Sequence, residues 1–262
     1  MPATPLIAYT QVGKTFDGGR VVAVDDVSLE VAEGEFLAIV GGSGSGKTTL
    51  LRLANRLIET DSGSITVEGE DVRSVDPILL RRRIGYVFQS GGLFPHLTVT
   101  DNIGITPKLT GTPPAEISAR VDELLDLVRL DRAQYRDRLP HELSGGQRQR
   151  VGVARALAAK PRIVLMDEPF GALDPLTRDA LGDDFRELHR ALGLTTVMIT
   201  HDMTEAILLA DRIAVMGGGR LLAQGTPAEL SESDDTYVGE LLRTPRRQAE
   251  RLGALLPRDG AA

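Results

Sequence analysis

The chain has 262 residues, no cysteine and a formal net charge of -7 at pH 7. This length fits one large domain, or a core with one inserted subdomain. Without cysteine the chain forms neither disulfides nor thiolate metal sites. Its acidic balance argues against broad nucleic-acid binding, which relies on clustered Lys and Arg. No apolar run approaches the roughly 20 residues that span a bilayer, and no secretory signal is visible at the N-terminus. We therefore expect a cytoplasmic protein that reaches a membrane only through a partner.

The hydrophobic pattern predicts strands that alternate with helices. Residues 27–31 alternate apolar and polar side chains, as a half-buried strand does. Residues 36–40 are continuously apolar, which is typical of a strand buried on both faces. The elements expected after these are a helix over 48–57, a strand over 64–67, a helix over 77–83, a strand over 84–87, mainly helices from about 93 to 160, a strand over 163–166, a helix over 175–192, and strands over 196–199 and 213–216.

This alternation predicts an α/β fold with a mostly parallel sheet covered on both faces. The helical stretch over about 93–160 is expected to be an inserted subdomain. After about Tyr237 the periodicity is lost and arginines gather, so we expect a solvated, partly disordered tail over 237–262. The predicted domain is then residues 1–236.

A glycine-rich loop follows the strand over 36–40 directly and opens the next helix. The run from Gly41 to Thr48 fits G-x-x-x-x-G-K-[ST] in this strand–loop–helix context. Glycines let backbone N–H groups converge on phosphate oxygens, and the helix N-terminus favours an anion. Lys47 is the candidate for the β- and γ-phosphates, and the Thr48 hydroxyl for Mg²⁺. A plain helix-capping turn does not explain the Lys-Thr pair. The expected nucleotide ligands are Gly41, Gly42, Ser43, Gly44, Ser45, Gly46, Lys47, Thr48 and Thr49.

Two acidic residues end the apolar run over 163–166. Asp167 is expected at the carboxyl end of this strand, where ligands of open α/β sheets bind, and should hold Mg²⁺ directly or through water. Glu168 is the candidate for polarising the attacking water. The alternative makes both residues ordinary acids at a helix start, because Pro169 follows them. Their position beside the glycine loop favours the catalytic interpretation.

A second glycine pair, in Ser144-Gly145-Gly146-Gln147, opens the helix that runs through Arg155. Ser144 is expected to cap this helix. A capped helix N-terminus with two glycines also presents free N–H groups to an anion. If the chain's own loop already holds phosphates, this second anion site serves another nucleotide.

These three motifs, in this order, resemble the nucleotide-binding subunit of ATP-binding cassette (ABC) transporters, over nearly the whole chain. The resemblance implies a P-loop ATPase core with an N-terminal antiparallel β portion, and hydrolysis of ATP with Mg²⁺. It implies that Gln89 contacts Mg²⁺ and the attacking water, and that His201 reaches the γ-phosphate. It further implies that Asp174 touches an opposite subunit and that Phe16 stacks on adenine, although a core phenylalanine would look the same. Two copies should enclose two ATP molecules head to tail, with the Ser144–Gln147 motif closing over ATP bound to the other copy.

Three stretches, over residues 84–99, 166–178 and 199–206, resemble a narrower group: bacterial importers for osmoprotectants such as glycine betaine, choline and carnitine. This resemblance implies that the helical insert around Gln89–Leu97 docks against transmembrane permease subunits. A substrate-binding protein would act indirectly, and the chain would lie at the cytoplasmic face of the membrane.

Three other interpretations stay open. An importer for another solute, such as an amino acid, phosphonate or nitrate, is the main competitor, because the cassette does not touch the solute. A non-transport ABC ATPase acting on DNA or ribosomes usually carries a coiled-coil insertion, zinc cysteines or two cassettes. A nucleotide-gated binding module without turnover would lack Glu168 or His201, and both are present.

Overall fold

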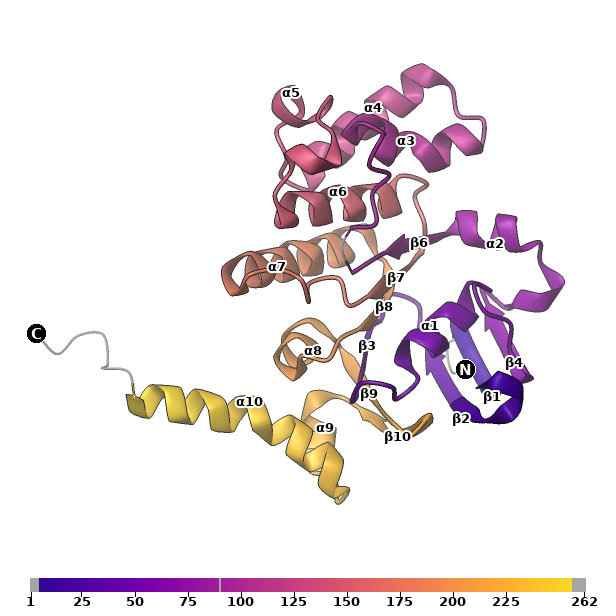
Figure 1. Cartoon of the computed structure of the whole chain (residues 1–262), viewed down its shortest axis with the longest axis vertical. Helices are drawn as coiled ribbons and strands as arrows, with labels where there is room; N and C mark the ends of the chain where they lie inside the picture. Colours follow the sequence, from indigo (N-terminus) through magenta and orange to yellow (C-terminus); the bar gives the residue numbers. More distant parts are fainter. Residues whose placement is uncertain (1–4, 90, 256–262) are drawn as a thin grey trace, which may run out of the picture.

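Two β-sheets organise the chain in the computed structural model, which describes residues 5–89 and 91–255 (Figure 1). The larger sheet has six strands in the order β10-β9-β3-β8-β7-β6. All neighbouring pairs in it are parallel except β9 and β10. The strands are β3 (Phe36–Val40), β6 (Ile84–Val87), β7 (Ile163–Asp167), β8 (Thr195–Ile199), β9 (Arg212–Gly217) and β10 (Arg220–Gly225). The predicted α/β class with a mainly parallel sheet is therefore confirmed.

The smaller sheet is antiparallel and lies in the N-terminal part of the chain. Its order is β2-β1-β4-β5, with β1 (Ile7–Phe16), β2 (Val21–Val31), β4 (Ser62–Val67) and β5 (Glu70–Asp71). The hydrophobic pattern missed β1 and the first half of β2. Register shifts between Tyr9 and Val12, and again before Thr15, interrupt the two-residue alternation of β1. A bulged strand does not show the periodicity by which strands are recognised.

The six-stranded sheet separates two hydrophobic cores. Alternate residues of β3 divide between them, because successive side chains of a strand point to opposite faces. Phe36, Ala38 and Val40 belong to the core shared with the helical insert. Leu37 and Ile39 belong to the core shared with the antiparallel sheet. All five are buried, which explains why this strand is apolar without a break.

Helices α3 to α6 form the insert between β6 and β7 and lie at the top of Figure 1. They are α3 (Val99–Leu109), α4 (Pro114–Leu127), α5 (Arg132–Tyr135) and α6 (Gly145–Leu157). The remaining helices are α1 (Lys47–Ala54), α2 (Pro77–Arg83), α7 (Pro175–Leu192), α8 (Met203–Leu209), α9 (Pro227–Ser231) and α10 (Thr236–Leu255). Within residues 5–89 and 91–255, none of these helices is both long and apolar enough to cross a bilayer.

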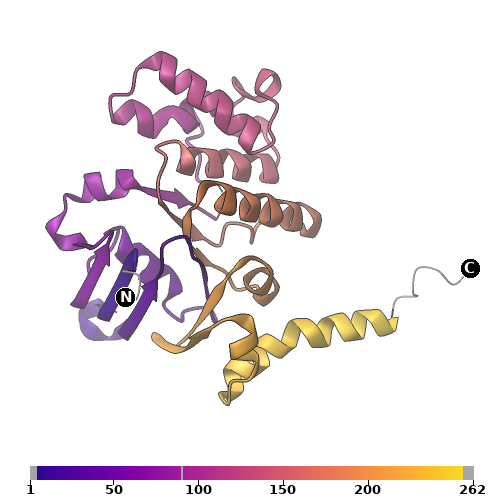
Figure 2. The ribbon, with the colours of Figure 1, turned by 180° about the vertical axis from the view of Figure 1, so that it is seen from behind.

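The C-terminal segment differs from the expectation of a partly disordered tail. Residues 236–255 form α10, which extends away from the body in both views (Figures 1 and 2). Val238 and Leu242 lie one helical turn apart and are buried, so the first half of α10 is anchored by packing. Its second half is exposed and rich in arginine, which hid the periodicity in the sequence. Residues 256–262 lie outside the described part, and the division into 1–236 and a tail remains a proposal.

Candidate active site

The glycine loop between β3 and α1 adopts a backbone that only glycine permits at two positions. Gly41 has φ 149° and Gly46 has φ 96°, both in the region that L-residues avoid. A Cβ at Gly41 would overlap the carbonyl oxygen of Met216 on β9, and one at Gly46 would overlap that of Ala23 on β2. These two glycines therefore let the loop lie against both sheets.

Lys47 is buried at the start of α1, with its ammonium folded back over the loop. Its Nζ donates to the carbonyl oxygens of Gly41 (2.9 Å) and Gly42 (2.8 Å) and to Oγ of Ser45 (3.3 Å). Burial lowers the pKa of Lys47, and the neighbouring carboxylates of Glu168 and Asp167 counteract that shift. Each of the three N–H groups of the ammonium thus has an oxygen acceptor within the loop. A bound phosphate would replace these acceptors with its own oxygen atoms.

Asp167, the last residue of β7, accepts hydrogen bonds from three side chains on two other elements, α1 and β6. Thr48 Oγ1 on α1 lies 3.2 Å from its Oδ1. Arg52, one turn further along α1, donates to Oδ2 at 3.1 Å, and the Tyr86 hydroxyl on β6 donates to the same oxygen at 3.2 Å. The Thr48 hydroxyl and the Asp167 carboxylate are adjacent oxygen donors of the kind that Mg²⁺ prefers. The geometry therefore fits the predicted pairing of these two residues at a metal.

Glu168, the next residue, is held between two of the predicted catalytic side chains. Gln89 Nε2 donates to its Oε2 at 3.1 Å, and Nδ1 of His201 lies 3.3 Å from the same oxygen. The backbone of Glu168 has φ 46°, an unfavourable value for a residue with a side chain. Its N–H nevertheless donates to the carbonyl oxygen of Ile199 on β8, which fixes this turn. The structure thus brings together the side chains of Gln89, Glu168 and His201, which follow the strands β6, β7 and β8.

The loop and Glu168 open into one cleft of about 590 Å³. Phe16 lies at its edge with its ring partly exposed, and Lys14 Nζ lies 5.4 Å from the ring centroid. An exposed aromatic ring at a phosphate-binding cleft suits base stacking better than core packing. The lining residues are Phe16, Val21, Val22, Ala23, Ser43, Gly44, Ser45, Gly46, Lys47, Thr48, Thr49, Glu168 and His201.

The Ser144–Gln147 motif begins α6, as predicted, but does not line this cleft. Ser144 Oγ accepts from the Gln147 N–H at 3.2 Å, and the Gln147 side chain accepts from the Ser144 N–H at 2.8 Å. Such a reciprocal capping box is worth about 1 kcal/mol. Asp174 is also a helix cap, since its carboxylate accepts from the Thr177 N–H at the start of α7. Both motifs are ordered at helix starts yet contribute nothing to the nucleotide cleft of their own chain.

Three contacts of the site were not recognised from the sequence. Arg52 and Tyr86 reach Asp167 only because α1 and β6 both flank β7, which depends on the strand order. The Tyr237 hydroxyl on α10 accepts from the Gly42 N–H at 3.0 Å. Of these contacts, only that of Arg52 could have been predicted. Arg52 lies four residues after Thr48, and this spacing puts both side chains on the face of α1 that contacts Asp167.

Comparison with known proteins identifies the chain's relatives. The family model described as "ABC transporter" matches residues 24–171. The glycine betaine/carnitine/choline transport ATP-binding protein OpuCA of Bacillus subtilis is 48% identical over 259 residues, which cover 97% of this chain and 68% of the relative. The choline transport ATP-binding protein OpuBA of the same organism is 49% identical over 242 residues, covering 92% of this chain and 63% of the relative. The chain thus spans about two thirds of the length of these relatives.

A solved structure with the same fold contains hydrolysis products. It is a dimeric ATP-binding cassette in a post-hydrolysis state bound to ADP and Pi. It superposes with a TM-score of 0.75 and 32% identity, covering 84% of this chain and 98% of that one. Fold and site together define an ATP-hydrolysing cassette. The chain belongs to the ABC transporter family.

Replacing Lys47 with alanine should weaken ATP binding by about 100-fold, because a hydrogen bond from a charged group is worth up to about 3 kcal/mol. Calorimetric titration of both proteins with ATP measures this. Lys160, an exposed lysine that does not line this cleft, provides the matched control as Lys160→Ala. Wild-type affinity in Lys47→Ala would contradict the role of this loop.

Replacing Glu168 with glutamine should leave ATP binding within about twofold of wild type and slow hydrolysis by about 10²- to 10⁴-fold, since it removes one carboxylate from proton transfer. Phosphate release and nucleotide binding are measured in parallel on the same preparation. If Glu168→Gln hydrolyses ATP at the wild-type rate, Glu168 is not the catalytic base.

Proposed function

We propose that this chain is the ATP-hydrolysing subunit of a bacterial importer for quaternary-amine osmoprotectants. The observation that carries the proposal is the identity of 48% to a glycine betaine/carnitine/choline transport ATP-binding protein over 97% of the chain. The cleft supports it, because it joins a phosphate loop with Glu168, which Gln89 and His201 both contact.

In the proposed reaction, the loop N–H groups and Lys47 hold the β- and γ-phosphates, and Phe16 stacks on the adenine. Thr48, Asp167 and Gln89 would hold Mg²⁺, which supplies charge to offset the negative charge that develops on the phosphate oxygens. Glu168 accepts a proton from the attacking water. His201, which follows β8 between the strands that carry the phosphate loop and Glu168, contacts the γ-phosphate and the same water.

We propose a head-to-tail dimer for this reaction. The N–H groups at the start of α6 form an anion site that the chain's own cleft does not use. In both views α6 lies with the helical insert, well above α1 (Figures 1 and 2). A second copy can bring its α6 start to the nucleotide on this chain's α1.

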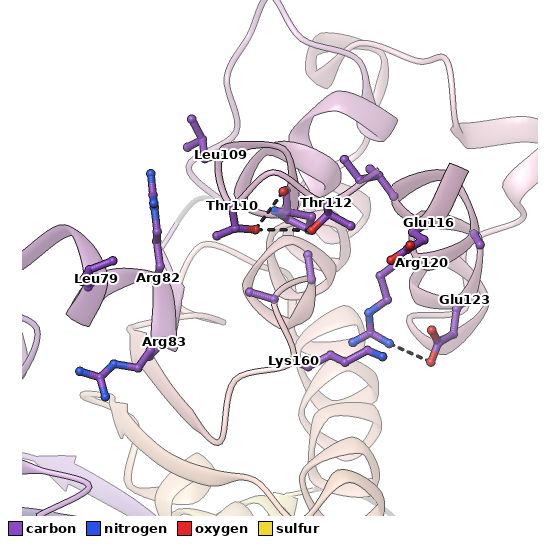
Figure 3. A pocket seen from close by; sticks show the side chains of 15 residues that line it. Leu79, Arg82, Arg83, Leu109, Thr110, Thr112, Glu116, Arg120, Glu123 and Lys160 are labelled. Atoms are coloured by element: carbon purple, nitrogen blue, oxygen red, sulfur yellow. Dashed lines mark hydrogen bonds and ion pairs between the residues drawn. The ribbon is translucent and has the colours of Figure 1, made fainter. Parts of the chain in front are cut away.

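A groove between the core and the helical insert is the proposed docking site for permease subunits. Its cavity of about 960 Å³ lies between α2, the end of α3, and α4 (Figure 3). Leu79 and Leu109 are more than half exposed at its edge. Arg82 and Lys160 line the same cavity, while Arg83 pairs with Glu70 and Arg120 with Glu123, so an amphipathic segment with an acidic group toward Arg82 and Lys160 would be complementary. A second cavity of about 480 Å³ shares Arg82 and Leu109 with the first, and Phe94 in its lining belongs to the stretch Gln89–Leu97 that is expected to dock.

This docking would place the chain at the cytoplasmic face of the membrane, with a substrate-binding protein acting through the permease. In such an importer the cassette does not touch the transported solute, so the solute is identified by an uptake measurement. An importer for an amino acid, phosphonate or nitrate is the alternative that the following tests separate.

A mixing experiment tests the shared site. Ser144→Arg should bind ATP normally but not hydrolyse it, because a bulky cation would prevent a second copy from closing. Mixed with Lys47→Ala, it should recover about a quarter of the wild-type rate, since random pairing makes half the dimers mixed and each contains one complete site. No recovery on mixing, or full activity of Ser144→Arg alone, would contradict the head-to-tail arrangement.

An uptake experiment tests the cargo. Cells that lack this subunit should lose uptake of labelled glycine betaine, choline or carnitine, and keep uptake of amino acids, phosphonate and nitrate. The matched control is the same strain carrying Glu168→Gln, which should not restore uptake. Unchanged uptake of all three amines, with loss of another solute, would remove the osmoprotectant assignment and leave the ATPase intact.

A further inference from the structure

Arg178, in the first turn of α7, joins the loop that precedes this helix to the loop that carries His201. Its NH2 group donates to the carbonyl oxygen of Leu173 at 3.3 Å, and its NH1 group donates to Asp202 Oδ2 at 3.1 Å. Its Nε lies 3.6 Å from Glu205 Oε1. One rigid guanidinium thus contacts two loops that are separated by a whole helix and a strand.

The loop around His201 is ordered by the same group of side chains. The buried Thr200 hydroxyl donates to Glu205 Oε2 at 2.6 Å and accepts from the Asp202 N–H at 3.0 Å. Asp202 in turn caps α8 through the Thr204 N–H at 2.8 Å. His201 itself is exposed, but the residues on both sides of it are held by hydrogen bonds. The position of its ring therefore depends on where this loop lies.

The loop that precedes α7 lies directly against the catalytic side chains. A Cβ at Gly171 would stand 3.5 Å from Cε1 of His201 and 3.8 Å from Nε2 of Gln89, which is ordinary van der Waals contact. The Gly171 N–H donates to the carbonyl oxygen of Glu168 at 3.3 Å. Displacement of this loop would therefore shift Gln89, Glu168 and His201.

We propose that Arg178 is a positioning residue that couples the loop over residues 171–174 to His201, so that contact of this loop with a second copy sets His201 against Glu168. The inference rests on the head-to-tail dimer proposed above. Arg178 does not line the nucleotide cleft, and acts through the Asp202 carboxylate and the Leu173 carbonyl. A lysine keeps the charge but, as a point charge on a flexible stem, does not bridge both acceptors.

The test compares Arg178→Lys and Arg178→Ala with Arg190→Lys, a matched change at an exposed arginine on the same helix. In both Arg178 variants kcat should fall about 10- to 100-fold, as expected for a misplaced catalytic group. KM for ATP and the binding affinity should stay within about twofold of wild type. Arg190→Lys should match wild type in every measurement.

A spectroscopic readout separates positioning from general stability. The chain has four histidines, so the Cε1–H signal of His201 can be assigned by its loss in His201→Gln. Added ATP should shift this signal in Glu168→Gln, and shift it much less in Glu168→Gln combined with Arg178→Lys. Both proteins should still dimerise with ATP by light scattering.

Four outcomes overturn the inference. Two concern catalysis: kcat is unchanged in both Arg178 variants, or ATP binding is lost together with kcat. The other two concern the double variant: ATP shifts its His201 signal as much as in Glu168→Gln, or the double variant alone fails to dimerise. If Glu168→Gln itself stays monomeric with ATP, the head-to-tail dimer of the proposed function is contradicted. This result differs from all four outcomes above, in which Glu168→Gln forms a dimer.

Discussion

The rest of the structure depends on the close fit of the glycine loop between the two sheets. The loop follows β3 of the parallel sheet, and at Gly41 it passes the carbonyl oxygen of Met216 on β9 without room for a side chain. At Gly46 it passes that of Ala23, which belongs to β2 of the antiparallel sheet. Because both sheets meet at this loop, the end of β1 brings Phe16 to the nucleotide cleft. A Cβ at Gly41 would collide with the parallel sheet, and a Cβ at Gly46 would collide with the antiparallel sheet.

Charge balance at the loop follows from that fit. Burial disfavours the charged form of Lys47, while Asp167 and Glu168 favour it. The same carboxylates therefore serve two purposes: they stabilise the lysine, and they supply oxygen atoms for the metal and the water. Tyr86 adds a neutral hydrogen bond to Asp167 and is itself affected, since burial raises its pKa to about 12. It thus remains a hydrogen-bond donor at neutral pH.

The sequence predicts the parts of the site that are formed by neighbours along the chain, and it does not predict the parts that depend on tertiary contacts. The glycine loop, the Asp167–Glu168 pair and the capped start of α6 are each defined by neighbours in sequence, and the structure places them at the expected strand and helix ends. The sequence places Tyr237 in a tail, because apolar periodicity is lost and arginines gather after it. Its hydrogen bond to Gly42 depends on how α10 packs, and no sequence pattern encodes that.

The helical insert is connected to the active site by hydrogen bonds from α6, the helix that the Ser144–Gln147 motif begins. Gln149 Nε2 donates to the carbonyl oxygen of Phe88, the residue before Gln89, at 3.1 Å. Two turns on, Arg155 donates to the carbonyl oxygens of Gly91 and Gly92 at 2.8 Å and 2.7 Å.

The backbone on both sides of Gln89 is therefore attached to α6 rather than only to the strand that precedes it. In the proposed dimer, the start of α6 would face the nucleotide of a second copy, while its later turns hold the backbone on both sides of Gln89, so a shift of α6 would move both sites. The smaller cavity beside the proposed permease groove borders the same backbone, because Phe88 and Gly92 line it. In the proposed assembly, binding of a permease there and closing of the dimer would act on this one helix, which would give a physical route between transport and hydrolysis.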